Sequence, residues 1–157
     1  MRRSGARAAG AILLLCTATW AARQYVAVTA PQAVSGKPGD KVEISIPFKV
    51  LEGFHINSNK PTFEYMIATK VEWSESALKH LDDVFPPAQM KAFSFSPGKK
   101  LAVFEGSQIV KARFAIPAGT APGKLTVDGK LRYQACDHQT CYPPNSIDVR
   151  VVVEVKK

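Results

Sequence analysis

The sequence predicts an all-β protein that folds as a sandwich of two sheets, and three observations support this fold class. Apolar and polar residues alternate over several stretches, most clearly over 42–50, and a period of two is the pattern of half-buried strands. Turns rich in Gly and Pro separate these stretches. Only residues 76–81 have helical character, and that segment is too short to form a stable helix. Strands at this spacing are typical of an immunoglobulin-like β-sandwich.

The length and composition of the chain suit a single domain. Of its 157 residues, 46% are hydrophobic and 22% are charged, which is ordinary globular usage and enough for one buried core. We expect this domain to span residues 23–157, because residues 1–22 read as a secretory signal peptide. They have a basic start, an apolar run over 8–15 that is too short to span a bilayer, and a small-residue cleavage site at 19–22.

A second interpretation of this leader is that Cys16 is a lipoprotein acylation site. The preceding residue is Leu15, which is bulky where such a site has a small residue, so cleavage near Ala22 is the favoured interpretation. Cleavage there would remove one of the three cysteines and leave two, a number suited to one disulfide in an oxidising compartment. The sequence therefore predicts export to the periplasm or another extracytoplasmic space.

Eight segments are expected to form strands. The first holds Val26 and Val28, and a Gly/Pro turn at 36–40 precedes the alternating segment over 42–50. Pro47 lacks a backbone N–H, so its strand is expected at a sheet edge or bulged at that point. The remaining expected strands lie at 54–57, 69–73, 110–116, 125–127, 131–133 and 147–155.

The net charge of +8 at pH 7 does not predict nucleic-acid binding. Without the leader and its three arginines, 18 basic and 13 acidic residues would remain, a net charge of +5. The lysines are scattered and form no cluster with interleaved aromatic residues. A solvated basic surface, with mild attraction to an anionic membrane face, is the favoured interpretation.

Two cysteines hold most of the chemistry that the sequence offers. Four residues separate Cys136 from Cys141, and the flanking segments 131–133 and 147–151 alternate as the strands of a hairpin do. Directly opposed residues of an antiparallel pair have Cα atoms roughly 4.5 to 5.5 Å apart, within the roughly 4.4 to 6.8 Å that a disulfide needs. The two sulfurs can therefore bond without a change in the backbone.

Three interpretations of this pair are open at this point. The first is a structural disulfide that ties the hairpin. The second is a zinc site on Cys136, His138 and Cys141, for which the nearby sequence offers no fourth ligand. The third is a redox-active pair that opens and closes in use. Thioredoxin-type pairs have two intervening residues at a helix N-terminus, so thiol chemistry here would need a β scaffold.

Three segments resemble a known family: Gly53–Pro61, Val103–Gly106, and the cysteine segment 131–144. In this order they are similar to the N-terminal periplasmic domain of the thiol:disulfide interchange protein DsbD. The resemblance covers nearly the whole chain after the leader and implies an immunoglobulin-fold redox domain with Cys136 and Cys141 as its couple. It also implies that Cys141 forms the mixed disulfide with downstream partners.

The segment 85–100 contains three prolines and three phenylalanines. The prolines predict a loop, because they interrupt a continuous ladder. The phenylalanines are expected either to plug the end of the sandwich or to cover the disulfide. The resemblance implies the second role, an aromatic cap that a partner displaces, with Phe95 as the first choice and Phe93 as the second. Such a cover would exclude attacking groups and disfavour the thiolate.

Four further residues are candidate modulators of the couple. Asp137 lies in the expected hairpin loop, where its carboxylate would disfavour a thiolate, and a protonated His138 would favour one. Tyr142 follows the second cysteine and is expected to pack. His55 falls where the resembling family has aromatic residues near the disulfide. It is expected to be an ordinary surface histidine, with proton transfer as the alternative.

The favoured function is an extracytoplasmic thiol:disulfide exchange module, a component of a protein-disulfide reductase. Its couple would pass two electrons from a membrane-embedded thiol carrier or a thioredoxin-like protein to oxidised periplasmic partners through a mixed disulfide. The resemblance implies disulfide isomerases and cytochrome c maturation proteins as these partners. No cofactor or metal is needed, since the sulfurs carry the electrons. The alternative is a non-catalytic binding or structural sandwich with a static hairpin disulfide.

Overall fold

The computed structural model describes residues 23–157, which form strands and no helix. The predicted all-β class is therefore confirmed. The expected signal peptide at 1–22, with Cys16, lies outside the described residues. In chain order the strands are β1 (Val26–Val28), β2 (Val34–Gly36), β3 (Lys41–Val50), β4 (His55–Asn57), β5 (Lys70–Trp73), β6 (Lys79–Val84), β7 (Gln89–Ala92), β8 (Lys100–Phe104), β9 (Ser107–Ala115), β10 (Gly123–Tyr133), β11 (Ala135–Cys136) and β12 (Asn145–Val155).

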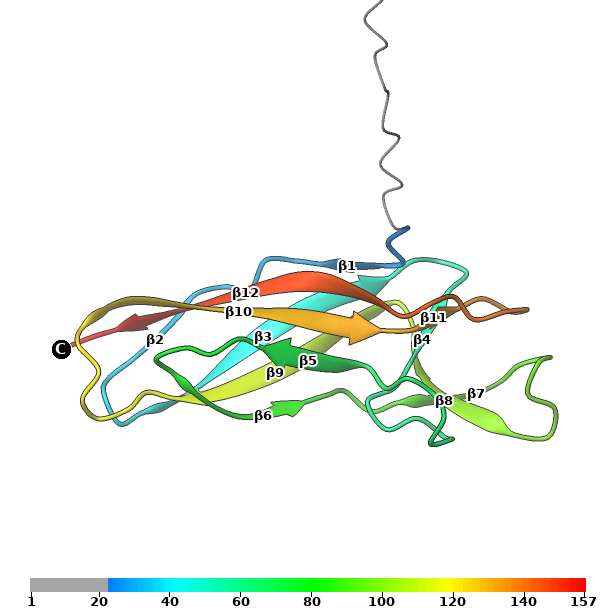
Figure 1. Ribbon diagram of the computed structural model, residues 1–157, viewed down its shortest axis with the longest axis horizontal. Coiled ribbons are helices and arrows are strands. Elements are labelled where there is room, and N and C mark those ends of the chain that lie inside the picture. The colour runs from blue at the N-terminus through cyan, green and yellow to red at the C-terminus, as the bar shows by residue number, and fades with distance from the viewer. Residues whose placement is uncertain (1–22) are drawn as a thin grey trace, which may run out of the picture.

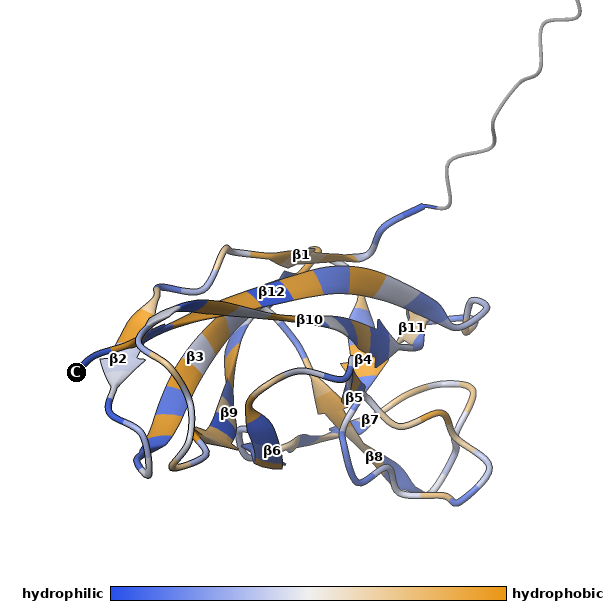
Figure 2. Ribbon diagram, turned by 60° about the vertical axis from the view of Figure 1, so that its left-hand side comes forward, coloured by the Kyte–Doolittle hydropathy of each residue, from blue (hydrophilic) through white to orange (hydrophobic). Residues whose placement is uncertain are grey.

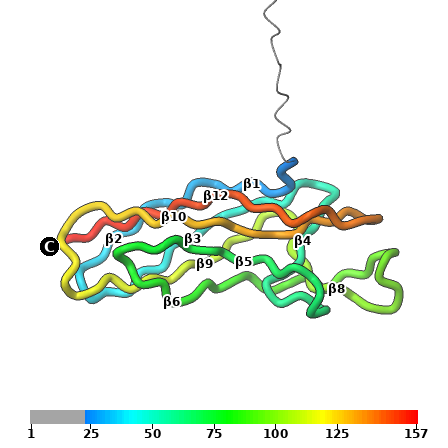
Figure 3. Tube along the Cα trace, in the orientation of Figure 1, coloured from blue at the N-terminus to red at the C-terminus, as the bar shows by residue number. Residues whose placement is uncertain are grey.

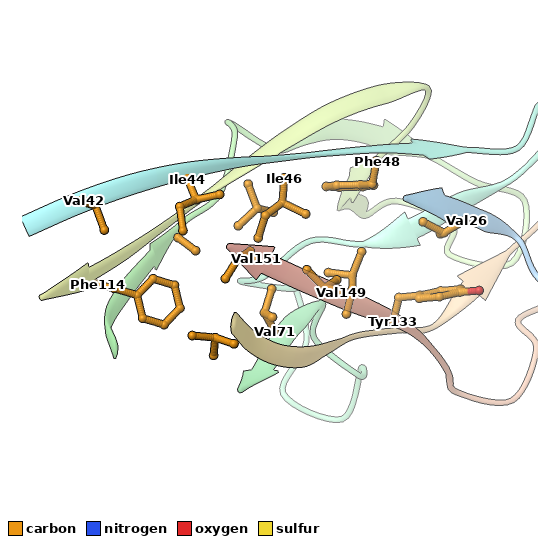
Figure 4. Packing of buried hydrophobic residues seen from close by; sticks show 14 of the residues in the cluster. Val26, Val42, Ile44, Ile46, Phe48, Val71, Phe114, Tyr133, Val149 and Val151 are labelled. Carbon is orange, nitrogen blue, oxygen red and sulfur yellow. The ribbon is translucent and has the colours of Figure 1, made fainter. Parts of the chain in front are cut away.

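Two four-stranded sheets face each other and form an immunoglobulin-like sandwich (Figure 1). One sheet has the strand order β1-β3-β9-β6 and the other β2-β12-β10-β5. Hydropathy alternates in bands along β3 and β12 (Figure 2). The inward side chains, among them Ile44, Phe114 and Val151, fill the space between the sheets (Figure 4). Burial of each such side chain stabilises the fold by roughly 1.5–3 kcal/mol.

A third sheet, with the order β11-β4-β8-β7, lies at the end of the sandwich away from the C-terminus (Figure 3). Its strand β8 is apolar on both faces, and successive residues of a strand point to opposite faces. Phe104 belongs to the main core, whereas Leu101 and Val103 form a second cluster with Phe93. This second cluster holds the β7–β8 loop, residues 93–99, against the outer face of the third sheet.

Residues 76–81 form no helix, as expected of so short a segment, and β6 begins at Lys79 and pairs with β9. One local expectation was wrong in part, where strand pairing outweighs local sequence preference. The segment 85–100 is a loop only in part, because β7 fits between its prolines and pairs with β8. The expected strands at 125–127 and 131–133 are one continuous strand, β10.

The expectation for Pro47 was also wrong, because β3 is an inner strand between β1 and β9. The carbonyl of Pro47 accepts a hydrogen bond from the Thr29 N–H at 2.9 Å. The nitrogen and carbonyl of one strand residue face the same neighbour, so the Pro47 nitrogen also faces the β1 side. β1 ends at Val28. The missing donor therefore falls where that ladder stops, and an inner strand tolerates the proline.

Candidate functional site

The disulfide joins Cys136, the last residue of β11, to Cys141 with an S–S distance of 1.99 Å. The two residues oppose each other in an isolated antiparallel bridge, as the sequence predicts. Their Cα atoms are 3.9 Å apart, closer than expected. The β10–β12 ladder ends at the pair Tyr133 and Asn145. The disulfide lies in the segment between these two residues, outside the ladder. In this segment β11 pairs with β4 of the third sheet.

The two sulfur-bearing residues differ in exposure. Cys136 is 0% exposed, whereas Cys141 lies on the surface. The difference follows from position, because β11 is covered by its neighbours and Cys141 precedes Pro143 and Pro144, which do not continue the ladder. An incoming sulfur can therefore reach Cys141 and not Cys136.

Asp137 fixes the turn between the cysteines. Its Oδ1 accepts hydrogen bonds from the backbone N–H groups of Gln139 at 2.7 Å and Thr140 at 2.8 Å. Its Oδ2 accepts a hydrogen bond from the Tyr142 hydroxyl at 2.7 Å. The tyrosine hydroxyl, followed by the two backbone donors, lowers the pKa of Asp137 from 3.8 to about 2. Asp137 is therefore an ionised anchor of the turn, and the same bond raises the pKa of Tyr142.

His55 lies directly opposite Cys136 in the ladder between β4 and β11. It is 2% exposed, so the expectation of a surface histidine was wrong. The third sheet and the β7–β8 loop enclose its ring, which stacks on Phe93 with centroids 4.0 Å apart. Burial is the main cause that lowers the pKa of His55 from 6.5 to about 4. The imidazole is thus neutral at pH 7.

The β7–β8 loop contacts the cysteine turn. The Ser94 hydroxyl donates a hydrogen bond to the carbonyl of His138 at 2.9 Å. Phe93 is 7% exposed and lies over His55, whereas Phe95 is 37% exposed and stacks on Phe93 at 5.3 Å. Phe95 and Cys141 line the same pocket of about 360 Å³. The pocket is also lined by Phe63, Tyr65, Met66, Ile67, Ser96, Leu101 and Gln134.

The structure brings every predicted site residue into this one region. Sequence reasoning missed three polar supports. The Asn57 side-chain amide donates to the Ile67 carbonyl at 3.0 Å and to Gln134 Oε1 at 3.2 Å, and the amide of Gln134 donates to the Tyr142 carbonyl at 3.2 Å. Ser94 is the third. The period-two spacing of His55 and Asn57 was the one available signal, since it places both on the same strand face.

No group of three or more His, Cys, Asp and Glu side chains within residues 23–157 is placed to hold a metal ion. The two cysteines of the zinc interpretation are bonded to each other. In the same described part of the chain, no helix is long and apolar enough to cross a membrane. The site consists of a disulfide with one exposed cysteine, a neighbouring imidazole and an aromatic loop.

A β-sandwich with such a disulfide at its end fits the class of thiol:disulfide exchange modules. The family model described as "Thiol:disulfide interchange protein DsbD, N-terminal" matches residues 22–152. The chain belongs to this family, as the resemblance implied. No curated protein matches the chain.

Solved structures with a similar chain path include the reduced N-terminal domain of Neisseria meningitidis DsbD. The identity is 16% and the TM-score 0.45, over 81% of this chain and 85% of that one. The seventh ScaB type I cohesin of Pseudobacteroides cellulosolvens is 15% identical with a TM-score of 0.47, over 85% and 94% of the two chains. The major fimbrial subunit AggA of Escherichia coli is 12% identical with a TM-score of 0.42, over 83% and 93%.

Proposed function

We propose that the protein is an extracytoplasmic thiol:disulfide exchange module, a reductase component that passes two electrons to oxidised partner proteins. The observation that carries the proposal is the unequal exposure of one bonded pair, with Cys136 buried and Cys141 on the surface. Membership of the DsbD N-terminal family supports it. A structural disulfide that only stabilised the turn would need neither an exposed cysteine nor an aromatic loop beside it.

Exchange proceeds through a mixed disulfide. In the reduced protein the thiolate of Cys141 attacks a partner disulfide, and one partner sulfur leaves as a thiolate. The sulfur of Cys136 then attacks Cys141, which closes the internal disulfide and releases the second partner sulfur. The partner gains two electrons and the pair loses two. A dithiol of an upstream protein restores the reduced pair by the reverse sequence.

The β7–β8 loop acts as a cap in this proposal. Phe95 beside Cys141 and Phe93 over His55 place apolar surface around the disulfide, which narrows the approach to the exposed Cys141. Apolar surface beside the sulfurs disfavours the thiolate and slows the approach of small disulfides. A partner that displaces the loop, and breaks the bond from Ser94 to the His138 carbonyl, gains a wider approach to Cys141.

The proposed partners follow from the family. Upstream, a membrane-embedded thiol carrier or a thioredoxin-like protein supplies the electrons. Downstream, periplasmic disulfide isomerases or cytochrome c maturation proteins receive them. The signal peptide proposed at 1–22 would deliver the domain to the periplasm, with acylation at Cys16 as the less favoured route. A cofactor is not required, because the sulfurs exchange electrons directly.

The test is the equilibrium reduction potential of the couple, measured in glutathione or dithiothreitol redox buffers. We expect a potential above about −300 mV, the range of working couples, whereas structural disulfides fall below it. A Cys136→Ala variant should retain mixed disulfides on Cys141, because it lacks the sulfur that resolves them, and mass spectrometry would identify the partners. A potential below that limit, with no trapped species, would leave the static sandwich as the correct interpretation.

A further inference from the structure

His55 stands at the buried sulfur of the pair. It is the residue directly opposite Cys136 in the β4–β11 ladder, and side chains of opposed residues point to the same face with Cβ atoms roughly 4.5 to 5.5 Å apart. Ile56 and Ala135, the next opposed pair, point to the main core on the other face. The imidazole and the Cys136 sulfur therefore share the face that the β7–β8 loop covers.

The Nε2 atom of His55 is buried and has no hydrogen-bond partner among residues 23–157. Native proteins satisfy the large majority of buried polar atoms, so an orphaned one calls for an explanation. The ring is held in place by Phe93, on which it stacks. When the disulfide is reduced, the Cys136 thiol becomes a donor on the same face, and a neutral imidazole nitrogen is an acceptor.

We propose that His55 is a catalytic residue, the general base that takes the proton of the Cys136 thiol when that sulfur resolves the mixed disulfide. The inference rests on the exchange function proposed above and adds a step to it. Cys141 is exposed and can ionise into solvent. Cys136 is buried, and burial disfavours its thiolate. A positioned base removes that obstacle.

The step is balanced in atoms and electrons. The S–H bond of Cys136 breaks, and its proton goes to Nε2 of His55. The freed electron pair forms the bond from Cys136 to the Cys141 sulfur, and the bond from Cys141 to the partner sulfur breaks. The partner sulfur leaves as a thiolate and takes up a proton from water. His55 then releases to solvent the proton that it took from Cys136.

The ring is unprotonated at pH 7, as a proton acceptor must be. Burial keeps the imidazole neutral at pH 7, because it lowers the pKa of His55 to about 4. Among the facing groups, Glu105 and Asp137 raise that pKa, whereas His138 and Lys91 lower it. A thiolate formed beside the ring adds a negative charge, which raises the basicity of the imidazole as the proton moves. A pocket of about 420 Å³, lined by His55 with Glu105, Lys91 and His138, offers the proton a path to water.

A chromogenic small disulfide, dithiobis(nitrobenzoate), separates the two halves of the reaction. Reduced protein releases one coloured thiolate when Cys141 attacks the reagent and a second when Cys136 resolves the adduct. The second phase is intramolecular, so its rate does not depend on reagent concentration. The comparison uses reduced wild type, His55→Phe, which keeps an aromatic ring against Phe93, and His80→Phe, a histidine on β6 away from the site.

We expect His55→Phe to slow the second phase by about tenfold or more at pH 7, at the low end of general-base effects. Its rate should rise about tenfold per pH unit between pH 6 and 8, as for unassisted ionisation of a thiol, whereas the wild-type rate changes little. His80→Phe should behave as wild type. His55→Gln, which cannot take the proton, serves as a second variant if the phenylalanine protein folds poorly.

A second phase within twofold of wild type, with an unchanged pH profile in both His55 variants, would overturn the role of His55 and leave the exchange function standing. A reduced wild type that releases no coloured thiolate in either phase would contradict the exchange function itself. The two failures are therefore distinguishable.

Discussion

The environments of single side chains set the reactivity of the pair. Asp137 is adjacent to Cys136 in sequence and is ionised, since three hydrogen bonds stabilise its charged form. A negative charge beside a sulfur disfavours a thiolate there. The carboxylate is directed to the turn amides and to Tyr142, so its main structural effect is to fix the loop that presents Cys141.

The order of this turn should depend on acidic pH. The folded state depresses the pKa of Asp137 from 3.8 to about 2, so its contribution to stability is complete above pH 4 and is lost as the pH falls through 2. We expect the NMR amide signals of Gln139 and Thr140 to shift with a midpoint near pH 2.

The Tyr142→Phe variant is the control for that titration. This variant lacks the hydroxyl that contributes most to lowering the pKa of Asp137, so the midpoint should move upward, toward 3.8. Asp137→Asn should abolish the transition. A wild-type midpoint at 3.8, unchanged in Tyr142→Phe, would mean that the network around the carboxylate does not exist in solution.

The β7–β8 hairpin has the structure of a part that can open. Its strand β7 is exposed at every residue and lies at the edge of the third sheet. Besides the ladder between β7 and β8, three contacts hold this segment: the ion pair between Lys91 and Glu105, the bond from Ser94 to His138, and the second apolar cluster. Segments with few buried contacts open at low free-energy cost.

Loss of the Phe95 ring should expose the reactive Cys141 further. We expect Phe95→Ala to speed the reaction of reduced protein with a small disulfide several-fold, because exchange rates depend on access to the attacking thiol. Stopped-flow measurement of the first, bimolecular phase gives this rate. Stability should change little, since Phe95 is already 37% exposed.

Two variants of the same hairpin provide controls. Met90→Ala, at a residue 55% exposed on β7, should leave the rate unchanged. Phe93→Ala should lower the free energy of unfolding by about 3 kcal/mol, because it empties a buried site. Unaltered exchange rates for both Phe95→Ala and Phe93→Ala would remove the cap from the proposed function.

The disulfide is peripheral to the fold of the protein. The main cluster draws on both sheets of the sandwich and includes neither cysteine. The β10–β12 ladder extends over eleven residues of each strand. The Cys136–Cys141 disulfide lies beyond the end of that ladder, so its reduction leaves the core unchanged. A redox cycle requires this.

The protein should therefore stay folded without the disulfide. We expect a variant with Cys136→Ala and Cys141→Ala to keep its near-ultraviolet circular dichroism and to lose about 2 kcal/mol of unfolding free energy, the entropic contribution of so short a loop. Urea titration of this variant and of oxidised wild type gives the difference. An unfolded variant would show that the bond is structural, contrary to a redox role.

Local patterns were sufficient to predict the β-sandwich and the opposed cysteines, because alternation, turn residues and short spacings are properties of neighbouring residues. The aromatic segment beside the cysteines was expected only from the family resemblance. The edge position assigned to Pro47 and the surface position of His55 were wrong, since each depends on pairing with strands far away in the chain. His55 is separated from Cys136 by eighty other residues. Only the pairing of β4 with β11 and the packing of the β7–β8 loop bring an imidazole to the buried sulfur, because burial and hydrogen bonding are set by the strands and loops that meet in the folded chain.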